Sequence, residues 1–244
     1  MKEIERIEAQ AVREAVLLGG GRAELAGGAV CFTHPLVPIM ELNRAMPVGE
    51  HVDVQAIAAW FDGAHAVSTN DDELQRQLED RRYTPGRTWM KFERDGAPAA
   101  KVETDLEVRE TLDAELFARV AGEGSGIPPE ASGPLAAIVG APGWCCFVAW
   151  AGAEPAASGA LYVDGPSAWV GIGSTRPDFR RRGAQAALLA ARIARARELG
   201  VTQMATETGE LLPGKPSSSY SNILRAGFRE AYLRPNWRSP ERLT

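Results

Sequence analysis

The sequence predicts an α/β protein with a mixed, mostly antiparallel sheet and helices on both faces. Three observations support this prediction. Short strand candidates alternate with longer segments whose apolar residues recur at helical spacing. Glycine-containing turns separate three consecutive strand candidates in the second half, which is typical of an antiparallel meander. The order of elements in the second half nearly repeats the order in the first, so we expect two tandem units of one fold.

The first half begins with a helix over residues 2–18, which the glycines at 19–21 end. Asp53 can cap a second helix that runs to Phe61, and acidic residues open a third over 70–81. The expected strands cover residues 22–26, 29–34, 37–42, 65–68 and 88–94. A strand-like stretch then continues to Arg109.

The second half has its own series of elements, which starts at about residue 105. Thr111 is the candidate cap of its first helix, and glycines break that helix after Val120. Further helices are expected over 129–139, 183–199 and about 217–226. The expected strands cover residues 105–109, 144–151, 156–163, 168–174, 202–207 and 228–237. In the 183–199 helix, the apolar face includes Leu189 and Ile193, and Arg192 is expected outside it.

Composition excludes several classes of function. The 244 residues are 45% hydrophobic and 24% charged, an ordinary globular mix that can bury a stable core. The net charge of −5 argues against a nucleic-acid partner, which requires a concentrated basic face. We find no apolar run long enough for a membrane helix and no signal peptide. The spacing of the histidines predicts no metal site.

The three cysteines predict no covalent framework. Their number is odd, and their spacing fits neither disulfides nor zinc. We therefore expect small apolar strand residues in a reduced, cytoplasmic protein. Cys145 and Cys146 are adjacent in a strand, so their side chains should point to opposite faces.

Three arginines and a glycine at residues 180–183 carry the clearest chemical signal. They follow a strand and a proline-containing loop, and they precede a strong helix former. A helix start leaves about four N–H groups without partners, and these groups with the helix dipole form an anion site. Gly183 lets a phosphate approach the backbone, and Ala184 keeps that approach open. The arginines can neutralise a pyrophosphate or a 3′-phosphate.

This segment resembles the GNAT superfamily of acyltransferases, which carries R/Q-x-x-G-x-G/A between its fourth strand and third helix. Residues 180–183 match the first four positions, whereas Gln185 departs from the small residue usual at the last. Residues 220–228 resemble the fourth helix of that family with its closing Gly-Phe pair. The resemblance implies that residues 105–244 form an acetyltransferase domain, and the repeated order of elements predicts that residues 1–104 form a degenerate GNAT-like copy. An unrelated N-terminal domain is the alternative.

The resemblance implies that the second unit binds acetyl-CoA. Backbone groups of Gly173, Ser174 and Thr175 would pair with the pantetheine arm, and an N–H there would stabilise the thioester oxyanion. Asn222 is a candidate side-chain contact to the same arm. The N–H groups that would hold the pyrophosphate belong to Arg180, Arg181, Arg182, Gly183, Ala184 and Gln185.

The general acid and base follow less directly. Many family members have a tyrosine four residues before the Gly-Phe pair, where this chain has Ile223. Tyr220, almost one helical turn earlier, and Tyr232, on the last strand, are the two candidates for the acid. A structural tyrosine is the alternative for each. Glu207 is the candidate base, and a solvated carboxylate is the alternative.

The implied reaction is direct transfer of an acetyl group to an amine of a small molecule or peptide, without a covalent enzyme intermediate. The alternative is a sensor or scaffold that binds acetyl-CoA without transfer, because Ile223 replaces the usual tyrosine. A P-loop protein is disfavoured because no G-x-x-x-x-G-K-[ST] is present. The first unit is expected to shape the acceptor pocket or an oligomer contact, such as a homodimer interface.

Overall fold

The structure is a computed structural model that describes residues 3–37 and 39–240. The helices are α1 (Glu3–Leu18), α2 (Val54–Trp60), α3 (Asp72–Asp80), α4 (Ala114–Ser125), α5 (Gly133–Ala137), α6 (Ala184–Glu198) and α7 (Ser218–Arg225). The strands are β1 (Arg22–Ala26), β2 (Ala29–Thr33), β3 (Arg44–Pro47), β4 (Ala66–Ser68), β5 (Thr84–Asp95), β6 (Glu107–Glu110), β7 (Trp144–Ala151), β8 (Glu154–Asp164), β9 (Ser167–Thr175), β10 (Gln203–Gly209) and β11 (Arg229–Arg238).

All of these strands join one sheet in the order β1-β2-β3-β4-β11-β5-β10-β9-β8-β7-β6. Two pairs, β3 with β4 and β9 with β10, are parallel, and the other pairs are antiparallel. Both ends of the sheet therefore follow one plan: a run of antiparallel strands, three at the β1 end and four at the β6 end, then one parallel neighbour, then a long central strand. This order confirms the α/β class and the tandem arrangement.

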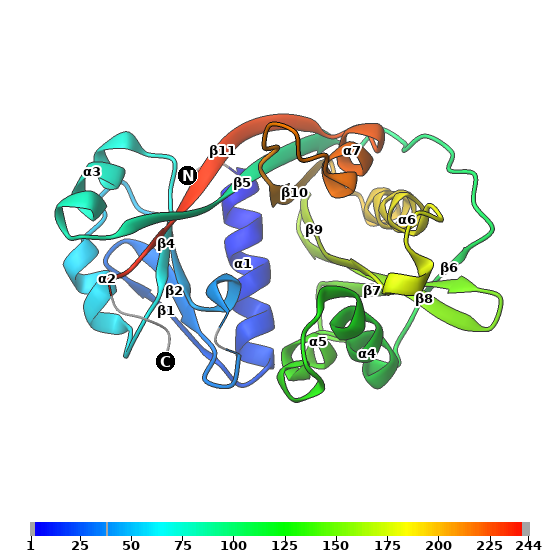
Figure 1. The fold of residues 1–244 in the computed structure, drawn as a ribbon, viewed down its shortest axis with the longest axis horizontal. Coiled ribbons are helices and arrows are strands. Elements are labelled where there is room, and N and C mark those ends of the chain that lie inside the picture. Colours follow the sequence, from blue (N-terminus) through cyan, green and yellow to red (C-terminus); the bar gives the residue numbers. More distant parts are fainter. Residues whose placement is uncertain (1–2, 38, 241–244) are drawn as a thin grey trace.

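The two halves exchange their last strands. β5 belongs to the first half in sequence but pairs with β10, and β11 ends the second half but pairs with β4. β5 and β11 also pair with each other, and Figure 1 shows them arching together between two lobes. The first lobe contains β1–β4, α2 and α3, and the second lobe contains β6–β10 and α4–α7. Neither half builds its share of the sheet from its own residues alone. The boundary between residues 104 and 105 stays a prediction.

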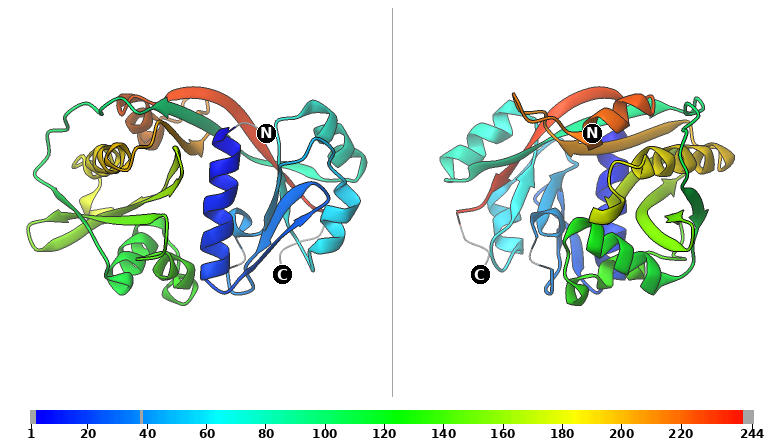
Figure 2. Two further views of the ribbon diagram at one scale, coloured as in Figure 1. Left: turned by 180° about the vertical axis from the view of Figure 1, so that it is seen from behind. Right: turned by 45° about the vertical axis from the view of Figure 1, so that its right-hand side comes forward.

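Helices cover the sheet in separate layers. In the second lobe, α6 and α7 pack on one face, around Leu188 and Ile223. On the other face α4, α5 and one side of α1 pack around Phe117 and Trp144. The two views of Figure 2 agree with Figure 1 in placing α1 between the lobes. Cys145 lies in the first of these clusters and Cys146 in the second, so their predicted opposite orientation is confirmed.

Local hydrogen bonds explain where several elements begin. The Asp53 side chain accepts from the N–H groups of Gln55 and Ala56, so the predicted cap of α2 is confirmed. The predicted cap at Thr111 is wrong, because Asp113 accepts from the N–H of Leu116 and begins α4. A short aspartate two residues further on reaches the first-turn amides directly.

Three other predicted elements differ in the structure. The predicted strand over 37–42 is a turn in the structure, and residue 38 lies outside the described residues. The Asn43 side chain stabilises this turn by donating to the carbonyls of Val37 and Ile39, and β3 begins after it. The helix over 129–139 divides into a short 3-10 turn at Pro129–Ala131 and α5, because prolines interrupt it. The strand-like stretch before Arg109 is irregular from 97 to 106.

Candidate functional site

The parallel strands β9 and β10 diverge and leave an opening in the sheet. They pair at three positions, of which Trp169 with Ala205 is the last. Beyond that pair the Val170 carbonyl accepts a hydrogen bond from the Thr206 hydroxyl at 2.7 Å, in place of a backbone N–H. The remaining backbone of β9 on this side therefore has groups available for another extended chain.

A β-bulge lies in β9 where the strands diverge. Ser158 pairs with Ser174 and Ala160 pairs with Gly171, so Ile172 and Gly173 together face Gly159 alone. Ile172 has a φ of 51°, which is unusual for a β-branched residue. Such strained backbone is typical of sites that position a ligand.

A buried arginine lies beneath this bulge. Arg192 is 2% exposed, and its Nη1 donates to the carbonyls of Gly171 at 2.9 Å and Ala160 at 3.2 Å. Gly159 is necessary here, because a Cβ on it would lie 2.7 Å from the guanidinium carbon. Burial lowers the pKa of Arg192 to about 9, so the side chain still carries its charge at neutral pH. The prediction that Arg192 lies outside the buried face of α6 is therefore wrong, because the bulge provides carbonyls for it.

The turn before α6 is open to solvent on one side. Arg180 to Gly183 are exposed, and Arg181 and Gly183 have positive φ values of 65° and 80°. Alternating backbone of this kind turns successive N–H groups toward one point and forms an anion-binding concavity. On its other side the turn is held by Thr104, which donates to the Arg182 carbonyl at 2.9 Å. Asp105 forms an ion pair with the Arg182 side chain.

Gln185 lies against the end of β9. Its Nε2 donates to the Ser174 carbonyl at 2.7 Å and to the Thr175 hydroxyl at 3.0 Å. Its Oε1 lies 2.7 Å from the position that a Cβ on Gly173 would take. The departure from the small-residue pattern thus has a structural consequence, because this side chain covers part of the backbone that a bound chain would use.

The equivalent turn in the first lobe is closed. There the Asp53 carboxylate accepts hydrogen bonds from the first amides of α2, whereas the N-cap position of α6 is Gly183, which has no side chain. The hairpin carbonyls of Gly27 and Gly28 accept from the amides of Asp53, Val48 and Gly49. The carboxylate repels an anion, and the amides that already donate hydrogen bonds cannot bind one.

Glu207, Lys91 and Tyr232 form one row across three neighbouring strands. Lys91 on β5 pairs with Glu207 on β10 and with Tyr232 on β11, so the three side chains share a face. Lys91 Nζ lies 2.7 Å from Glu207 Oε2, and the Trp169 indole donates to the same carboxylate at 3.1 Å. The Glu207 side chain is 11% exposed. Glu207 is therefore an oriented carboxylate at the opening, and the solvated alternative is wrong.

The row continues into a buried ionic cluster between the lobes. Glu8 of α1 is fully buried and accepts from Arg44, Lys91 and Arg234. Burial alone would raise the pKa of Glu8, but the three cations outweigh it and hold that pKa well below its usual range. With Glu5 and Glu207, the cluster has as many carboxylates as cations. Such balance keeps several buried charges compatible with folding.

Several known structures share the fold of this chain. No family model and no curated protein matches the sequence. A GCN5-related N-acetyltransferase from Kribbella flavida superposes with a TM-score of 0.71 at 16% identity, over 99% of this chain and 97% of that one. One from Sphaerobacter thermophilus gives 0.63 at 15% identity, over 88% and 81%. A tandem GNAT protein from the clavulanic acid biosynthesis pathway gives 0.60 at 12% identity, over 86% and 77%.

This chain has a GNAT fold. In it, β9 and β10 are the strands that diverge, and α6 is the helix that follows the arginine-rich turn. The similarity extends through both lobes, as the coverage of the first neighbour requires.

The remaining predicted residues of the GNAT site are not all brought together. Tyr220 of α7 packs edge-on against Phe92, on the face opposite to Glu207. Its hydroxyl donates to Glu230 at 2.6 Å, and burial together with that carboxylate raises the pKa of Tyr220 to about 12. Asn222, also on α7, accepts from Arg225 at 3.3 Å. Glu207 and Tyr232 thus share a face, and Tyr220 does not.

Tyr232 is tied to α1. Its hydroxyl donates to Glu5 at 2.6 Å, and burial and that carboxylate raise its pKa. Sequence reasoning did not find its neighbour Lys91, and it placed Arg192 of α6, which lies beneath the bulge, outside the buried face of that helix. A lysine between apolar neighbours in a strand, and an arginine one turn after a buried leucine, were the available signals. Both patterns also fit solvent-exposed side chains, so neither is specific.

The described ranges, 3–37 and 39–240, contain neither a metal-binding cluster nor a membrane-spanning helix. Within them no group of three or more His, Cys, Asp or Glu is placed to hold a metal ion. No helix in those ranges is both long and apolar enough to cross a membrane.

Proposed function

We propose that the second lobe binds acetyl-CoA between β9 and β10 and transfers its acetyl group to an amine. The divergence of these parallel strands, with a bulge in one and an open helix start at its end, carries the proposal. An extended thioester arm requires a free strand edge, and a diphosphate requires convergent amides. Both features occur here in sequence along one segment of the chain.

The residues fit the coenzyme with one adjustment. The concavity at Arg181 and Gly183 suits the pyrophosphate, and the exposed arginines beside it supply positive charge. The edge of β9 at Gly173 suits the pantetheine arm. The Gln185 side chain has to leave the Ser174 carbonyl for the arm to pair there. When bound, the coenzyme supplies an activated acyl group.

The amine nitrogen attacks the thioester carbonyl, the new C–N bond replaces the C–S bond, and the thiol leaves. The amine must lose a proton, and the departing thiolate must gain one. Glu207 is the proposed base, because its carboxylate lies at the opening and Lys91 and Trp169 fix its orientation. Tyr232 is the proposed acid, because it shares that face. The charged Arg192 beneath the bulge favours negative charge on the carbonyl oxygen.

The first lobe has no equivalent role in this proposal. The Asp53 carboxylate occupies the amides that a phosphate would need. Only one coenzyme is therefore expected per chain.

Calorimetric titration with acetyl-CoA tests the coenzyme site. Gly183→Trp places an indole where the pyrophosphate would lie, and we expect no detectable binding. Gly200→Trp is the matched control, because Gly200 ends the same helix, has the same φ of 80°, and has no neighbour within 4 Å of an added Cβ. Both variants strain the backbone equally, so unchanged affinity in a folded Gly183→Trp would refute the site.

A second candidate function is binding of acetyl-CoA without transfer. It is favoured by the hydroxyls of Tyr220 and Tyr232, which already donate to carboxylates, and by Ile223 at the usual tyrosine position. Release of free thiol from acetyl-CoA, measured over a panel of amines, separates the two functions. Stabilisation by the coenzyme with no thiol release on any amine would favour the sensor.

A further inference from the structure

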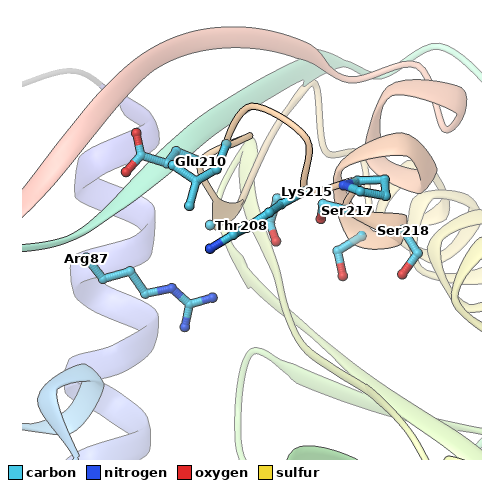
Figure 3. Close-up of a pocket in the computed structure, with 10 residues that line it drawn as sticks. Arg87, Thr208, Glu210, Lys215, Ser217 and Ser218 are labelled. Carbon is cyan, nitrogen blue, oxygen red and sulfur yellow. The ribbon is translucent and has the colours of Figure 1, made fainter.

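A cavity of about 420 Å³ lies beside the proposed base. It is bounded by the end of β10, by Arg87 of β5, and by the loop that leads into α7. Figure 3 shows its labelled lining, which comprises Arg87, Thr208, Glu210, Lys215, Ser217 and Ser218. Polar side chains therefore dominate this wall, in a part of the fold that the proposed coenzyme site does not use.

Two cations converge in this cavity. In Figure 3 the charged ends of Arg87 and Lys215 point toward each other across the space, while the Glu210 carboxylate turns away. Within residues 3–37 and 39–240, no hydrogen bond or ion pair is found for either charged group. Two like charges without an intervening carboxylate create a positive potential that attracts an anion.

Contacts with Trp89 and Gly209 fix the position of the Arg87 guanidinium. It lies over the Trp89 ring, with 4.8 Å from its central carbon to the ring centroid. It also lies across Gly209, where an added Cβ would be 3.0 Å from Nη2. Gly209 does not have a positive φ, so its backbone conformation does not require a glycine. The glycine is explained by the space that the guanidinium needs. The start of α7, at Ser218, adds the positive end of a helix to the same wall.

The cavity is on the same face as Glu207. Residues two apart on a strand point to the same side, so Arg87 shares a face with Lys91, and Gly209 shares one with Glu207. Two residues along a strand span about 7 Å. A molecule whose amine lies at Glu207 and whose acidic group lies at Arg87 therefore needs only a few bonds between them.

We propose that Arg87 and Lys215 bind the anionic group, a carboxylate or a phosphate, of the acceptor amine. This inference rests on the proposed acetyl transfer and assigns its substrate class. The acceptor is a small amino acid or an aminoalkyl phosphate. Its amine becomes an amide as the coenzyme thiol is released, and its acidic group takes no part in the bond changes.

Kinetics with matched amines test the class. The anionic probes are glycine, β-alanine and 2-aminoethyl phosphate, and the counterparts that lack the acidic group, called uncharged below, are glycinamide, β-alaninamide and ethylamine. We expect turnover of at least one anionic amine, with its kcat/KM about tenfold or more above that of its uncharged counterpart. Preference for the carboxylates or for the phosphate then identifies the acidic group. Preference for the uncharged amines would overturn the inference.

Substitutions locate the contact. Arg87→Gln and Lys215→Gln should each raise KM for the preferred anionic amine about tenfold, with little change in kcat. Arg22→Gln is the control, because Arg22 also lies over a tryptophan ring, that of Trp60, at 4.4 Å, but on the first lobe. Unchanged KM in both cavity variants would refute the assignment.

Two binding measurements separate this inference from the proposed function. If the wild type fails to bind acetyl-CoA, the proposed function fails. Titration of 2-aminoethyl phosphate into the wild type and into the double variant of Arg87 and Lys215 then still decides whether the cavity binds anions. If the double variant instead loses affinity for acetyl-CoA, the cations hold a coenzyme phosphate and the inference about the acceptor is overturned.

Discussion

Glu8 is the residue whose loss should affect the whole molecule most. It is fully buried in α1 between the lobes and accepts hydrogen bonds from three cations, Arg44, Lys91 and Arg234. Glu8→Gln keeps the shape of the side chain but removes its charge, so the cluster then holds more cations than carboxylates. Breaking a buried ion pair in this way costs about 3–5 kcal/mol.

This cost is large in relation to total stability. A folded chain is typically stable by about 5–15 kcal/mol, and 1 kcal/mol shifts the melting temperature of a chain of this size by about 2–4 °C. We therefore expect Glu8→Gln to lower the melting temperature by roughly 10 °C. The control is Glu198→Gln, since Glu198 forms an exposed pair with Arg195, and such pairs contribute about 0–1 kcal/mol.

The pH dependence gives an independent check. Because the folded pKa of Glu8 lies well below its unfolded value, its contribution is complete above the unfolded pKa, about 4.3, and is lost as pH falls through the folded pKa. Urea unfolding should therefore show the full difference between wild type and Glu8→Gln at pH 7 and a smaller one below about pH 4. A difference of less than about 1 kcal/mol at pH 7 would refute the assigned role of Glu8.

Three further predictions concern the proposed site. Glu207→Gln should lower kcat by about 100-fold or more while acetyl-CoA still binds. Thiol release measures kcat, calorimetry measures the affinity for acetyl-CoA, and full activity would exclude Glu207 as the base. Arg192→Met leaves the Gly171 carbonyl without its donor, so acetyl-CoA affinity should fall about tenfold, with partial recovery in Arg192→Lys. Tyr232→Phe should reduce kcat, whereas Tyr220→Phe should change only stability, by about 1 kcal/mol; the reverse result would assign the acid to α7.

Much of the second lobe could be predicted from sequence because its signals are local. The arginine-rich turn, the glycine before α6 and the strands around the meander each depend on neighbouring residues. The predicted helix over 183–199 and strand over 144–151 are confirmed by α6 and β7. Periodicity and turn residues fix such elements before any tertiary contact forms.

What could not be predicted depends on contacts distant in sequence. The exchange of β5 and β11 depends on tertiary pairing with β10 and β4, and the sequence pattern of neither strand indicates which strand it pairs with. Arg192 is buried only because the bulge in β9 exposes carbonyls to it. Lys91 is buried only because Glu8, far away in the sequence, lies opposite it. A single sequence does not encode such pairings in a local pattern.

The exchanged strands make the second lobe depend on residues of the first half of the chain. β5 closes the sheet beside β10, and without it the strand that carries Glu207 would be an unprotected edge. The same strand supplies Lys91, which orients Glu207, and Arg87, which lines the cavity beside it. The first lobe, in which Asp53 caps the start of α2, can therefore still complete the proposed site of the second lobe. Substitutions in β5 are therefore expected to act on both stability and the proposed acceptor site.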